Sequence, residues 1–307
     1  MNNILRQDNQ TANNVAHTPN RVRMPAWLRR PVAYTGQKKT IESFLRGSML
    51  HTVCVEAKCP NRGECFSKGT ATFLILGDTC SRSCRFCNVN KGAPLPVDCD
   101  EPARLCEAAQ KMNLRHSVVT SVTRDDLPDG GASQFVNVVR ALRQGMPGSS
   151  IELLIPDFNG NRDALAAVFD SMPDVLNHNI ETVPRLYSAI RPQARYEQSL
   201  AVLKAAAAKP LVAKSGLMVG LGETFDEVAG TLHDLADAGC SIVTIGQYLQ
   251  PSPQQIPVHE FITPEQFKAY EAAGAALGLE VFAGTFVRSS YRASELFNSY
   301  GSNDTAR

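Results

Sequence analysis

The sequence predicts an α/β fold in which parallel strands and helices alternate to form a partial TIM-type (β/α)6 barrel with N- and C-terminal extensions. The length of 307 residues suits one large domain, because such a barrel fills about 200 to 250 residues. From about residue 70 onward, short apolar or β-branched runs alternate with helical patterns. That alternation is typical of repeated βα units on a parallel sheet.

The predicted strands are short runs, each bounded by turn residues or by a helical pattern. In chain order they are TATFLILG, SVVTSV, IELLIPDF, VLNHNIE, SGLMVG, SIVTIGQYL and VFAGTF. Six or seven such units suit a partial or complete barrel better than a dinucleotide-binding sheet. No internal sequence repeat is visible.

Three of the predicted helices carry signals at their ends. Residues 100–113 have apolar side chains at helical spacing. Thr224 and Glu227 predict a capping box, and Gly239 is a plausible stop for the same helix. Pro264 occupies the expected first position of a third helix.

The chain divides into four predicted segments. Residues 1–20 are rich in Asn and have no hydrophobic period, which predicts a disordered tail. An N-terminal extension at 21–69, the barrel at 70–285 and a C-terminal segment at 286–307 follow. The tail lacks the basic start and apolar run of a secretory signal, although the basic bias of the first forty residues leaves a transit peptide as the minority interpretation. We therefore expect a reducing, cytoplasmic setting.

Charge and hydropathy give no reason to expect a nucleic acid or a membrane as a partner. Lys and Arg together number 31, and Asp and Glu number 30. No run approaches the roughly 20 apolar residues of a membrane span. Residues 21–30 are locally basic and contain the one tryptophan, Trp27, which we expect to anchor this arm to the barrel.

Six of the nine cysteines form two triplets. The first, with the spacing Cys-x4-Cys-x5-Cys, is Cys54, Cys59 and Cys65, and the second, with the spacing Cys-x3-Cys-x2-Cys, is Cys80, Cys84 and Cys87. A 4Fe–4S cluster usually takes four thiolates, so three leave one iron with an open position. Zinc is less favoured because zinc sites usually pair their cysteines and total four ligands. Cys99, Cys106 and Cys240 are expected to be structural.

The second triplet directly follows the first barrel strand, and loops at the carboxyl ends of barrel strands build active sites. Its spacing, with Phe86 before the last cysteine, resembles the motif of the radical S-adenosylmethionine (SAM) superfamily. The resemblance implies that the open iron binds the amino and carboxylate groups of SAM. It also implies reductive cleavage of the sulfonium to a 5′-deoxyadenosyl radical.

The first triplet resembles the auxiliary-cluster motif of the lipoyl synthase family, and the likeness covers about residues 21–291. It continues through GTATFLILGDTCSRSCRFC, VVTSVTRDDLPDGGA, HNIETVPRLY, AKSGLMVGLGET, TIGQYLQPS and the RSSY motif that starts at Arg288. The resemblance implies two 4Fe–4S clusters and makes Ser290 the fourth ligand of the auxiliary cluster. A serine oxygen is a hard ligand, so its bond to a soft cluster should be the weaker one.

The implied reaction is insertion of two sulfur atoms at C6 and C8 of a protein-bound octanoyl-lysine, with the auxiliary cluster as sulfur donor. The implied partners are an octanoylated carrier protein or lipoyl domain and an electron donor such as flavodoxin or ferredoxin. The basic segment at 21–30 is a candidate contact for an acidic carrier.

Weaker signals mark further cofactor contacts. By resemblance, the loop with Asp126, Gly130 and Gly131 holds the amino end of SAM, although an ordinary turn explains the same residues. Asn179 and Glu181 end the fourth strand, where Glu181 could accept hydrogen bonds from the ribose. The neighbouring histidine, His178, is more often structural at such a position.

Two alternatives remain open. The nearer one is another auxiliary-cluster radical enzyme, of the biotin synthase or methylthiolating kind. The RSSY motif and the Cys-x4-Cys-x5-Cys spacing of the first triplet argue against it. The other is a non-catalytic iron–sulfur electron carrier. A carrier would typically bind each cluster through four cysteines and need far fewer residues.

Overall fold

The computed structural model describes residues 25–28, 43–45, 47–57, 59–67 and 72–304. The expected tail at 1–20 lies outside these residues, as does most of the basic segment at 21–30. Within them, no helix is both long and apolar enough to cross a membrane.

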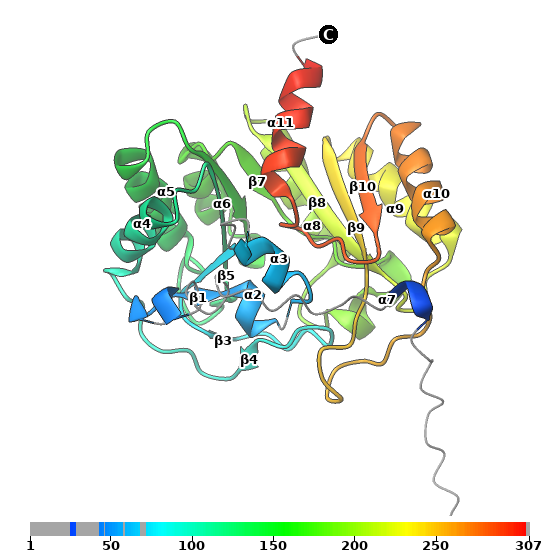
Figure 1. The fold of residues 1–307 in the computed structure, drawn as a ribbon, viewed down its shortest axis with the longest axis horizontal. Coiled ribbons are helices and arrows are strands. Elements are labelled where there is room, and N and C mark those ends of the chain that lie inside the picture. The colour runs from blue at the N-terminus through cyan, green and yellow to red at the C-terminus, as the bar shows by residue number, and fades with distance from the viewer. Residues whose placement is uncertain (1–24, 29–42, 46, 58, 68–71, 305–307) are drawn as a thin grey trace, which may run out of the picture.

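A single eight-stranded sheet forms the centre of the molecule (Figure 1). Its strands, in spatial order, are β1 (His51–Thr52), β2 (Thr72–Ile75), β5 (His116–Ser121), β6 (Ser150–Leu154), β7 (Val175–Asn177), β8 (Val212–Val219), β9 (Ile242–Gln247) and β10 (Glu280–Gly284). All neighbours pair in parallel except β1, which runs antiparallel to β2.

Each of the seven predicted runs overlaps a strand, so the predicted fold class is confirmed. Among the described residues, β1 and β10 are the two edges of the large sheet, and the barrel is therefore partial. A separate two-stranded sheet pairs β3 (Thr79–Cys80) with β4 (Asn90–Lys91).

Helices cover the outside of the barrel sheet and lie between successive strands. They are α4 (Glu101–Lys111), α5 (Ala132–Gly145), α6 (Arg162–Asp170), α7 (Pro184–Ile190), α8 (Tyr196–Ala207), α9 (Phe225–Asp237) and α10 (Pro264–Ala275). Short helices α2 (Val53–Glu56) and α3 (Arg62–Ser67) precede the barrel, and α11 (Ala293–Asp304) follows it. Two 3-10 turns, η1 (Ala26–Leu28) and η2 (Phe158–Gly160), complete the described elements.

The helix ends predicted from sequence are confirmed. The Thr224 side chain accepts from the backbone of Glu227, whose carboxylate accepts from Thr224 in return. Gly239 adopts φ +82°, as a residue just after a helix often does. Pro264 begins α10 as expected, behind the side-chain cap of Thr263.

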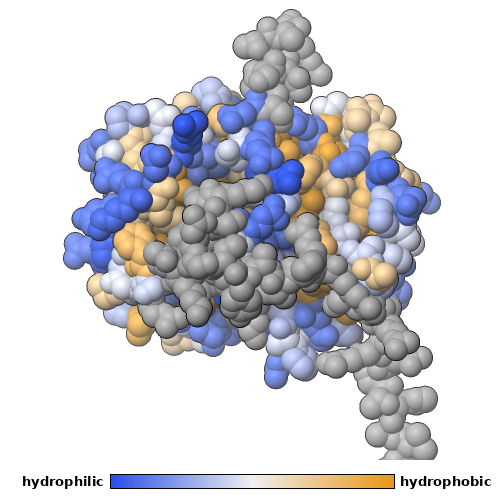
Figure 2. Space-filling view, viewed as in Figure 1, coloured by the Kyte–Doolittle hydropathy of each residue, from blue (hydrophilic) through white to orange (hydrophobic). Residues whose placement is uncertain are grey.

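The core has two main parts. One packs β2, β5 and β6 against α4, α5 and α6, and the other packs β8 and β9 against α9 and α10. In the view of Figure 1, hydrophobic side chains reach the surface near β9 and β10, whereas the periphery is mainly hydrophilic (Figure 2). Because the strands pack against helices in both parts of the core, their ends are fixed positions from which the loops extend.

Candidate functional site

The first cysteine triplet lies in a compact segment before β2. Cys54 is buried in α2, Cys59 follows that helix, and Cys65 lies in α3. Burial raises the pKa of Cys54 to about 12, and the nearby thiols of Cys59 and Cys65 add to the rise. A backbone group of Thr72 hydrogen-bonds the same thiol. The three predicted ligands therefore lie together beside the start of β2.

The C-terminal segment reaches the same place from the other end of the chain. The hydroxyl of Thr72 donates to Oγ of Ser290 over 2.7 Å, so Ser290 and Cys54 share Thr72 as a neighbour. Nearby, Nδ2 of Asn61 donates to the carbonyl of Phe286 over 2.6 Å. These contacts hold Ser290 beside the first triplet.

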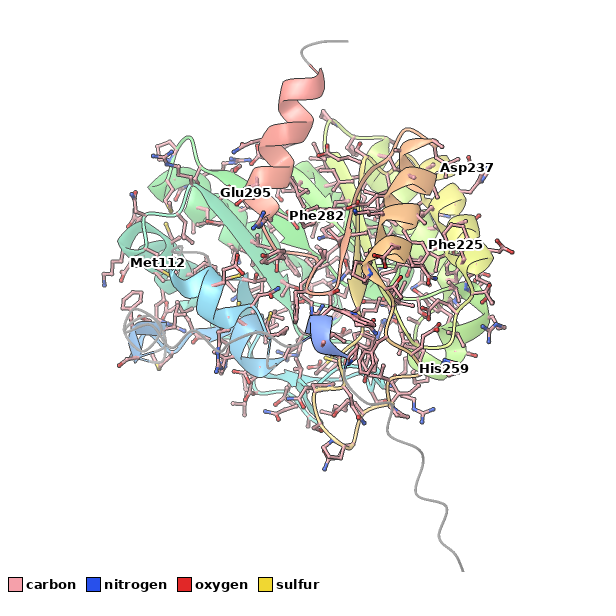
Figure 3. All side chains as sticks on the ribbon, turned by 45° about the vertical axis from the view of Figure 1, so that its right-hand side comes forward. Met112, Phe225, Asp237, His259, Phe282 and Glu295 are labelled. Carbon is pink, nitrogen blue, oxygen red and sulfur yellow. The ribbon has the colours of Figure 1, made fainter. Side chains whose placement is uncertain are left out.

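Tyr291 adds further contacts between the C-terminal segment and the rest of the chain. Its hydroxyl donates to Glu64 of α3 over 3.0 Å, and its ring stacks on Phe282 of β10 with centroids 6.5 Å apart. Figure 3 shows Phe282 near the start of α11. Trp27, whose side chain was expected to anchor the arm, is 47 % exposed and lines a cleft of about 370 Å³ together with Phe286 and Tyr291.

The second triplet lies in the loop after β2, at the carboxyl ends of the parallel strands. Sγ of Cys80, the last residue of β3, accepts from the backbone of Thr123 over 3.3 Å. The backbone of Arg85 donates to Ile190 over 2.9 Å and accepts from Ile256 over 3.1 Å. The loop is thus fixed by the segment after β5, the end of α7 and the segment after β9.

The thiols of the second triplet are close enough to influence one another. Burial raises the pKa of Cys87 to about 12, and Cys84 and Cys80 contribute to the rise. Burial also raises the pKa of Cys84. A cation that binds such thiols must displace their protons. Each triplet brings thiol donors within range of one another.

Within the described ranges, no group of three His, Cys, Asp or Glu side chains is placed as the ligands of one metal ion would be. A 4Fe–4S cluster spreads its protein ligands over different irons. Of the cysteines expected to be structural, Cys106 and Cys240 are buried, whereas Cys99 is exposed.

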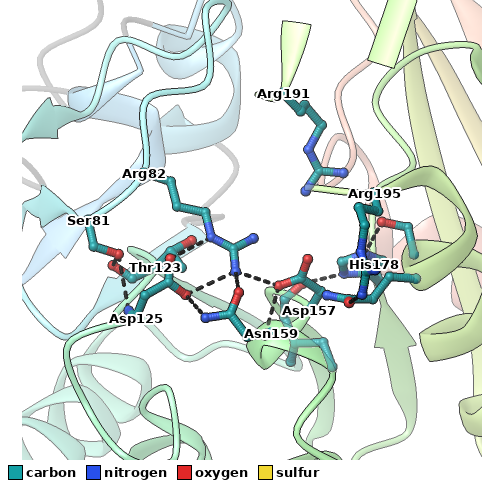
Figure 4. A network of polar contacts seen from close by, with 12 residues as sticks. Ser81, Arg82, Thr123, Asp125, Asp157, Asn159, His178, Arg191 and Arg195 are labelled. Atoms are coloured by element: carbon teal, nitrogen blue, oxygen red, sulfur yellow. Dashed lines mark hydrogen bonds and ion pairs between the residues drawn. The ribbon is translucent and has the colours of Figure 1, made fainter. Parts of the chain in front are cut away.

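Arg82, between the first two cysteines of the second triplet, anchors that loop (Figure 4). Only 4 % exposed, it donates to both carboxylate oxygens of Asp125 over 2.7 and 2.9 Å. Nη2 also reaches Asp157 over 2.7 Å and the side-chain oxygen of Asn159 over 2.6 Å. Burial opposes ionisation of Asp157, but Arg82 outweighs it and lowers the pKa of that carboxyl. The cluster loop is thereby joined to the loops after β5 and β6.

Asn179 and Glu181 follow β7 and contact each other. Nδ2 of Asn179 donates to Oε1 of Glu181 over 3.2 Å. Glu181 adopts φ +70°, which is uncommon for a residue with a Cβ, and backbone bonds to Gly216 and Met218 hold it there. Burial raises the pKa of Glu181, against the opposing charge of Arg191.

Arg191 is a site residue that the sequence did not single out. It is buried, and Nη1 donates to the carbonyl of Asn179 over 3.1 Å and to the hydroxyl of Tyr187 over 2.6 Å. Its charge also opposes the rise in pKa that burial gives Cys84. Arg191 therefore lies between the second triplet and Asn179. No local motif marks such an arginine at the end of a short helix.

The remaining predicted contacts have structural partners of their own. The Asp126 carboxylate is held by Arg124, at 2.8 Å from Nη2. Gly130 and Gly131 adopt φ +63° and +91°, and a Cβ at these positions would meet Phe158 and Leu76, respectively. Phe86 packs in a small core cluster with Ile190, Leu221 and Tyr248. Their role toward SAM stays a prediction.

His178 is satisfied on both ring nitrogens. Nδ1 lies 2.8 Å from the carbonyl of Ile155, so Nδ1 carries the hydrogen, because a carbonyl only accepts. Nε2 then accepts from Ser199 over 2.9 Å, and Ser199 in turn accepts from Tyr187 over 2.7 Å. This is the structural histidine that the sequence favoured.

The fold and the cysteine loop together define a radical SAM enzyme. The model of the radical SAM superfamily matches residues 74–235. The chain is 53 % identical over 275 residues to a lipoyl synthase of Caldanaerobacter subterraneus subsp. tengcongensis, covering 89 % of this chain and 96 % of the relative. Identity to a lipoyl synthase of Chlorobaculum tepidum is 52 %, covering 88 % and 94 %. The chain therefore belongs to the lipoyl synthase family.

Solved structures support the fold. Streptococcus suis SuiB bound to S-adenosylmethionine aligns with a TM-score of 0.56 at 8 % identity, covering 73 % of this chain and 54 % of that chain. Methylornithine synthase aligns with a TM-score of 0.50 at 12 % identity, covering 82 % and 83 %. Membership of the superfamily implies one 4Fe–4S cluster and SAM. The expectation of a lipoyl synthase enzyme is confirmed at the level of the family.

Proposed function

We propose that this chain inserts two sulfur atoms at C6 and C8 of a protein-bound octanoyl-lysine, giving the lipoyl group. The observation that supports this most directly is the meeting of Ser290 with the first cysteine triplet, through the 2.7 Å bond from Thr72. The three thiols precede the barrel in the sequence and the Ser290 hydroxyl follows it. None of the four donors belongs to the second triplet. A second cluster site is what sulfur donation requires.

Cys80, Cys84 and Cys87 would hold the cluster that binds SAM, and Cys54, Cys59, Cys65 and Ser290 would hold the auxiliary cluster. When bound, these groups would supply the electron that cleaves the sulfonium and the sulfur that enters the product, respectively. The chain's part is to position them. Arg82 fixes the loop of the second triplet through its carboxylate partners. The Asn61 and Tyr291 contacts fix the first triplet and Ser290.

The residues around Asn179 would orient SAM between the two sites. The Glu181 carboxylate can accept hydrogen bonds from ribose hydroxyls. Arg191 offers a buried cation on the same side, next to Cys84, and a guanidinium suits a carboxylate such as that of the methionine moiety. Phe86, Asp126, Gly130 and Gly131 complete the proposed contacts.

The proposal extends to partners and setting. An octanoylated carrier protein or lipoyl domain would present the acyl-lysine at the barrel mouth, and flavodoxin or ferredoxin would supply electrons in the cytoplasm. We propose domain boundaries at 21–69, 70–285 and 286–307 around these roles, with 1–20 as a tail. An acidic carrier would meet the basic segment at 21–30. Unchanged carrier affinity after charge reversal there would contradict that contact.

The test is anaerobic reconstitution with iron and sulfide, followed by reduction and reaction with SAM and an octanoyl-lysine peptide. We expect about eight irons per chain, a dithiolated peptide by mass spectrometry, and 5′-deoxyadenosine. The same iron content and 5′-deoxyadenosine with an unaltered peptide would contradict the substrate assignment. No cleavage of SAM would favour the electron-carrier alternative.

A further inference from the structure

A partly buried hydrogen-bond chain begins at the first serine of the RSSY motif. Oγ of Ser289 accepts from Nδ2 of Asn177 over 3.0 Å and donates to Oδ1 of Asn179 over 2.7 Å. Nδ2 of Asn177 also donates to Glu152 over 2.9 Å. Nζ of Lys214 donates to both oxygens of Glu152 at 2.9 Å. The motif is therefore connected to an ion pair inside the barrel.

The Lys214–Glu152 ion pair is shielded from water. Lys214 and Glu152 are each 1 % exposed, and Asn177 is not exposed at all. Burial disfavours the Glu152 carboxylate, but Lys214 and His116 outweigh burial and lower the pKa of Glu152 to about 2. Buried ion pairs contribute little net stability, and their best-attested use is to fix one arrangement over others.

The ion pair also sets the direction of every bond in the chain. An ammonium only donates and a carboxylate only accepts, so Asn177 must turn its nitrogen toward Glu152. The same nitrogen then donates to Ser289, whose own hydrogen is left for Asn179. With its oxygen engaged, Asn179 turns its nitrogen to Glu181, at 3.2 Å.

We propose that Ser289 is a positioning residue that couples the auxiliary-cluster ligand Ser290 to the Asn179–Glu181 pair on the SAM side. The inference rests on the proposed function for the roles of its two neighbours. Ser289 is bonded to Ser290 through one peptide, and its hydroxyl donates to one barrel residue and accepts from another. The segment cannot move without disturbing Asn179, and Asn179 cannot rotate without releasing the segment.

Removal of the hydroxyl would affect both ends of this coupling. In Ser289→Ala, Oδ1 of Asn179 loses its donor, and its amide group is free to turn away from Glu181. The backbone at 286–291 loses one tie to the barrel while retaining those of Asn61 and Tyr291. One lost hydrogen bond to a preorganised site corresponds to about a 5- to 10-fold loss of affinity.

Two measurements that use no octanoyl substrate test the coupling. We expect Ser289→Ala to raise the dissociation constant of the reconstituted protein for SAM about 5- to 10-fold. In the metal-free protein, we expect faster hydrogen exchange at 286–291. Ser289→Thr, which keeps the hydroxyl, should restore both. Ser117→Ala is the matched control, because Ser117 is fully buried in β5 and its hydroxyl has no partner among the described residues.

Faster exchange with unchanged SAM affinity would overturn the proposal, since Ser289 would then only tether the segment. Unchanged exchange with weaker SAM binding would also overturn it. A failure of sulfur insertion in the wild-type protein is a separate result, because neither measurement depends on product.

Discussion

Ser290 differs from the six proposed cysteine ligands in its donor atom, and the difference can be tested by one substitution. Ser290→Cys would replace a hard oxygen with a thiolate, which binds iron of a soft cluster more strongly. We expect slower loss of iron to a chelator and less dithiolated product per chain. Iron release and product yield are measured on the same reconstituted sample.

Ser290→Ala is the comparison for that variant, because it removes the donor without replacing it and should release iron faster than wild type. If Ser290→Cys released iron faster than wild type, Ser290 would not be a ligand, and the Thr72 contact would be its whole role.

His178 predicts a specific pH dependence of stability. Burial, with Arg191 as a second cause, lowers the pKa of His178 to about 4 from its usual 6.5. Below pH 6.5 the unfolded chain therefore takes up a proton that the folded chain does not. The free energy of unfolding should fall by up to about 1.4 kcal/mol per pH unit until pH about 4.

His178→Gln removes the titration while keeping a side chain that can donate and accept. Its unfolding free energy, measured in urea at several pH values, should fall less steeply than that of wild type between pH 6.5 and 4. Equal slopes for the two proteins would mean that His178 is accessible to protons in the folded state. Such a result would contradict the role of Nε2 as the acceptor of the hydrogen bond from Ser199.

The cluster loop after β2 depends on Arg82, so its rigidity can be tested in the metal-free protein. Arg82→Ala leaves Asp157 buried without its cation, which should lower the free energy of unfolding by about 3 to 5 kcal/mol. Arg82→Lys keeps the charge but not the planar fork and should lose less. Urea unfolding measures both.

Arg85→Ala provides the control, since Arg85 is an exposed arginine of the same loop. It should change stability by no more than about 0.5 kcal/mol. Similar losses for Arg82→Ala and Arg85→Ala would show that the contacts of Arg82 in Figure 4 do not hold the loop.

The elements of the barrel were predictable because their signals are local. Strand runs, the Thr224 capping box and Pro264 at the start of α10 depend on residues a few positions apart. The second triplet could be placed at the carboxyl edge of the sheet because it directly follows β2. These predictions required no knowledge of which distant segments meet.

The connections between elements were not predictable from pattern. Arg191, the ion pair of Lys214 with Glu152, and the bonds of Ser289 join residues far apart in sequence. Arg191, Lys214 and Glu152 do not stand out in their own segments, since a buried charge leaves no periodic signal. Only the family motif directed attention to Ser290, and its contact with Thr72 supports that placement.

At the scale of the whole molecule, the proposed auxiliary site connects the two flanks of the barrel. Thr72 and Ser290 are 218 positions apart, and the Asn61 and Tyr291 contacts join the same two segments. A cluster bound there would cross-link them in the native state alone. A ligand that binds only the native state at 100 times its dissociation constant adds about 2.7 kcal/mol of stability.

We therefore expect reconstituted protein to exceed metal-free protein in apparent free energy of unfolding by at least about 2 to 3 kcal/mol. Cys54→Ala should lose a large part of that gain. The gain of the variant is measured against its own metal-free form, so that the stability lost with the buried thiol is the same in both forms and cancels. Cys99→Ser, which changes an exposed cysteine outside both triplets, should keep the full gain. Anaerobic urea unfolding of the three proteins gives the comparison. An undiminished gain in Cys54→Ala would mean that the first triplet does not bind the added iron, because a cross-link cannot survive the loss of a buried ligand without cost.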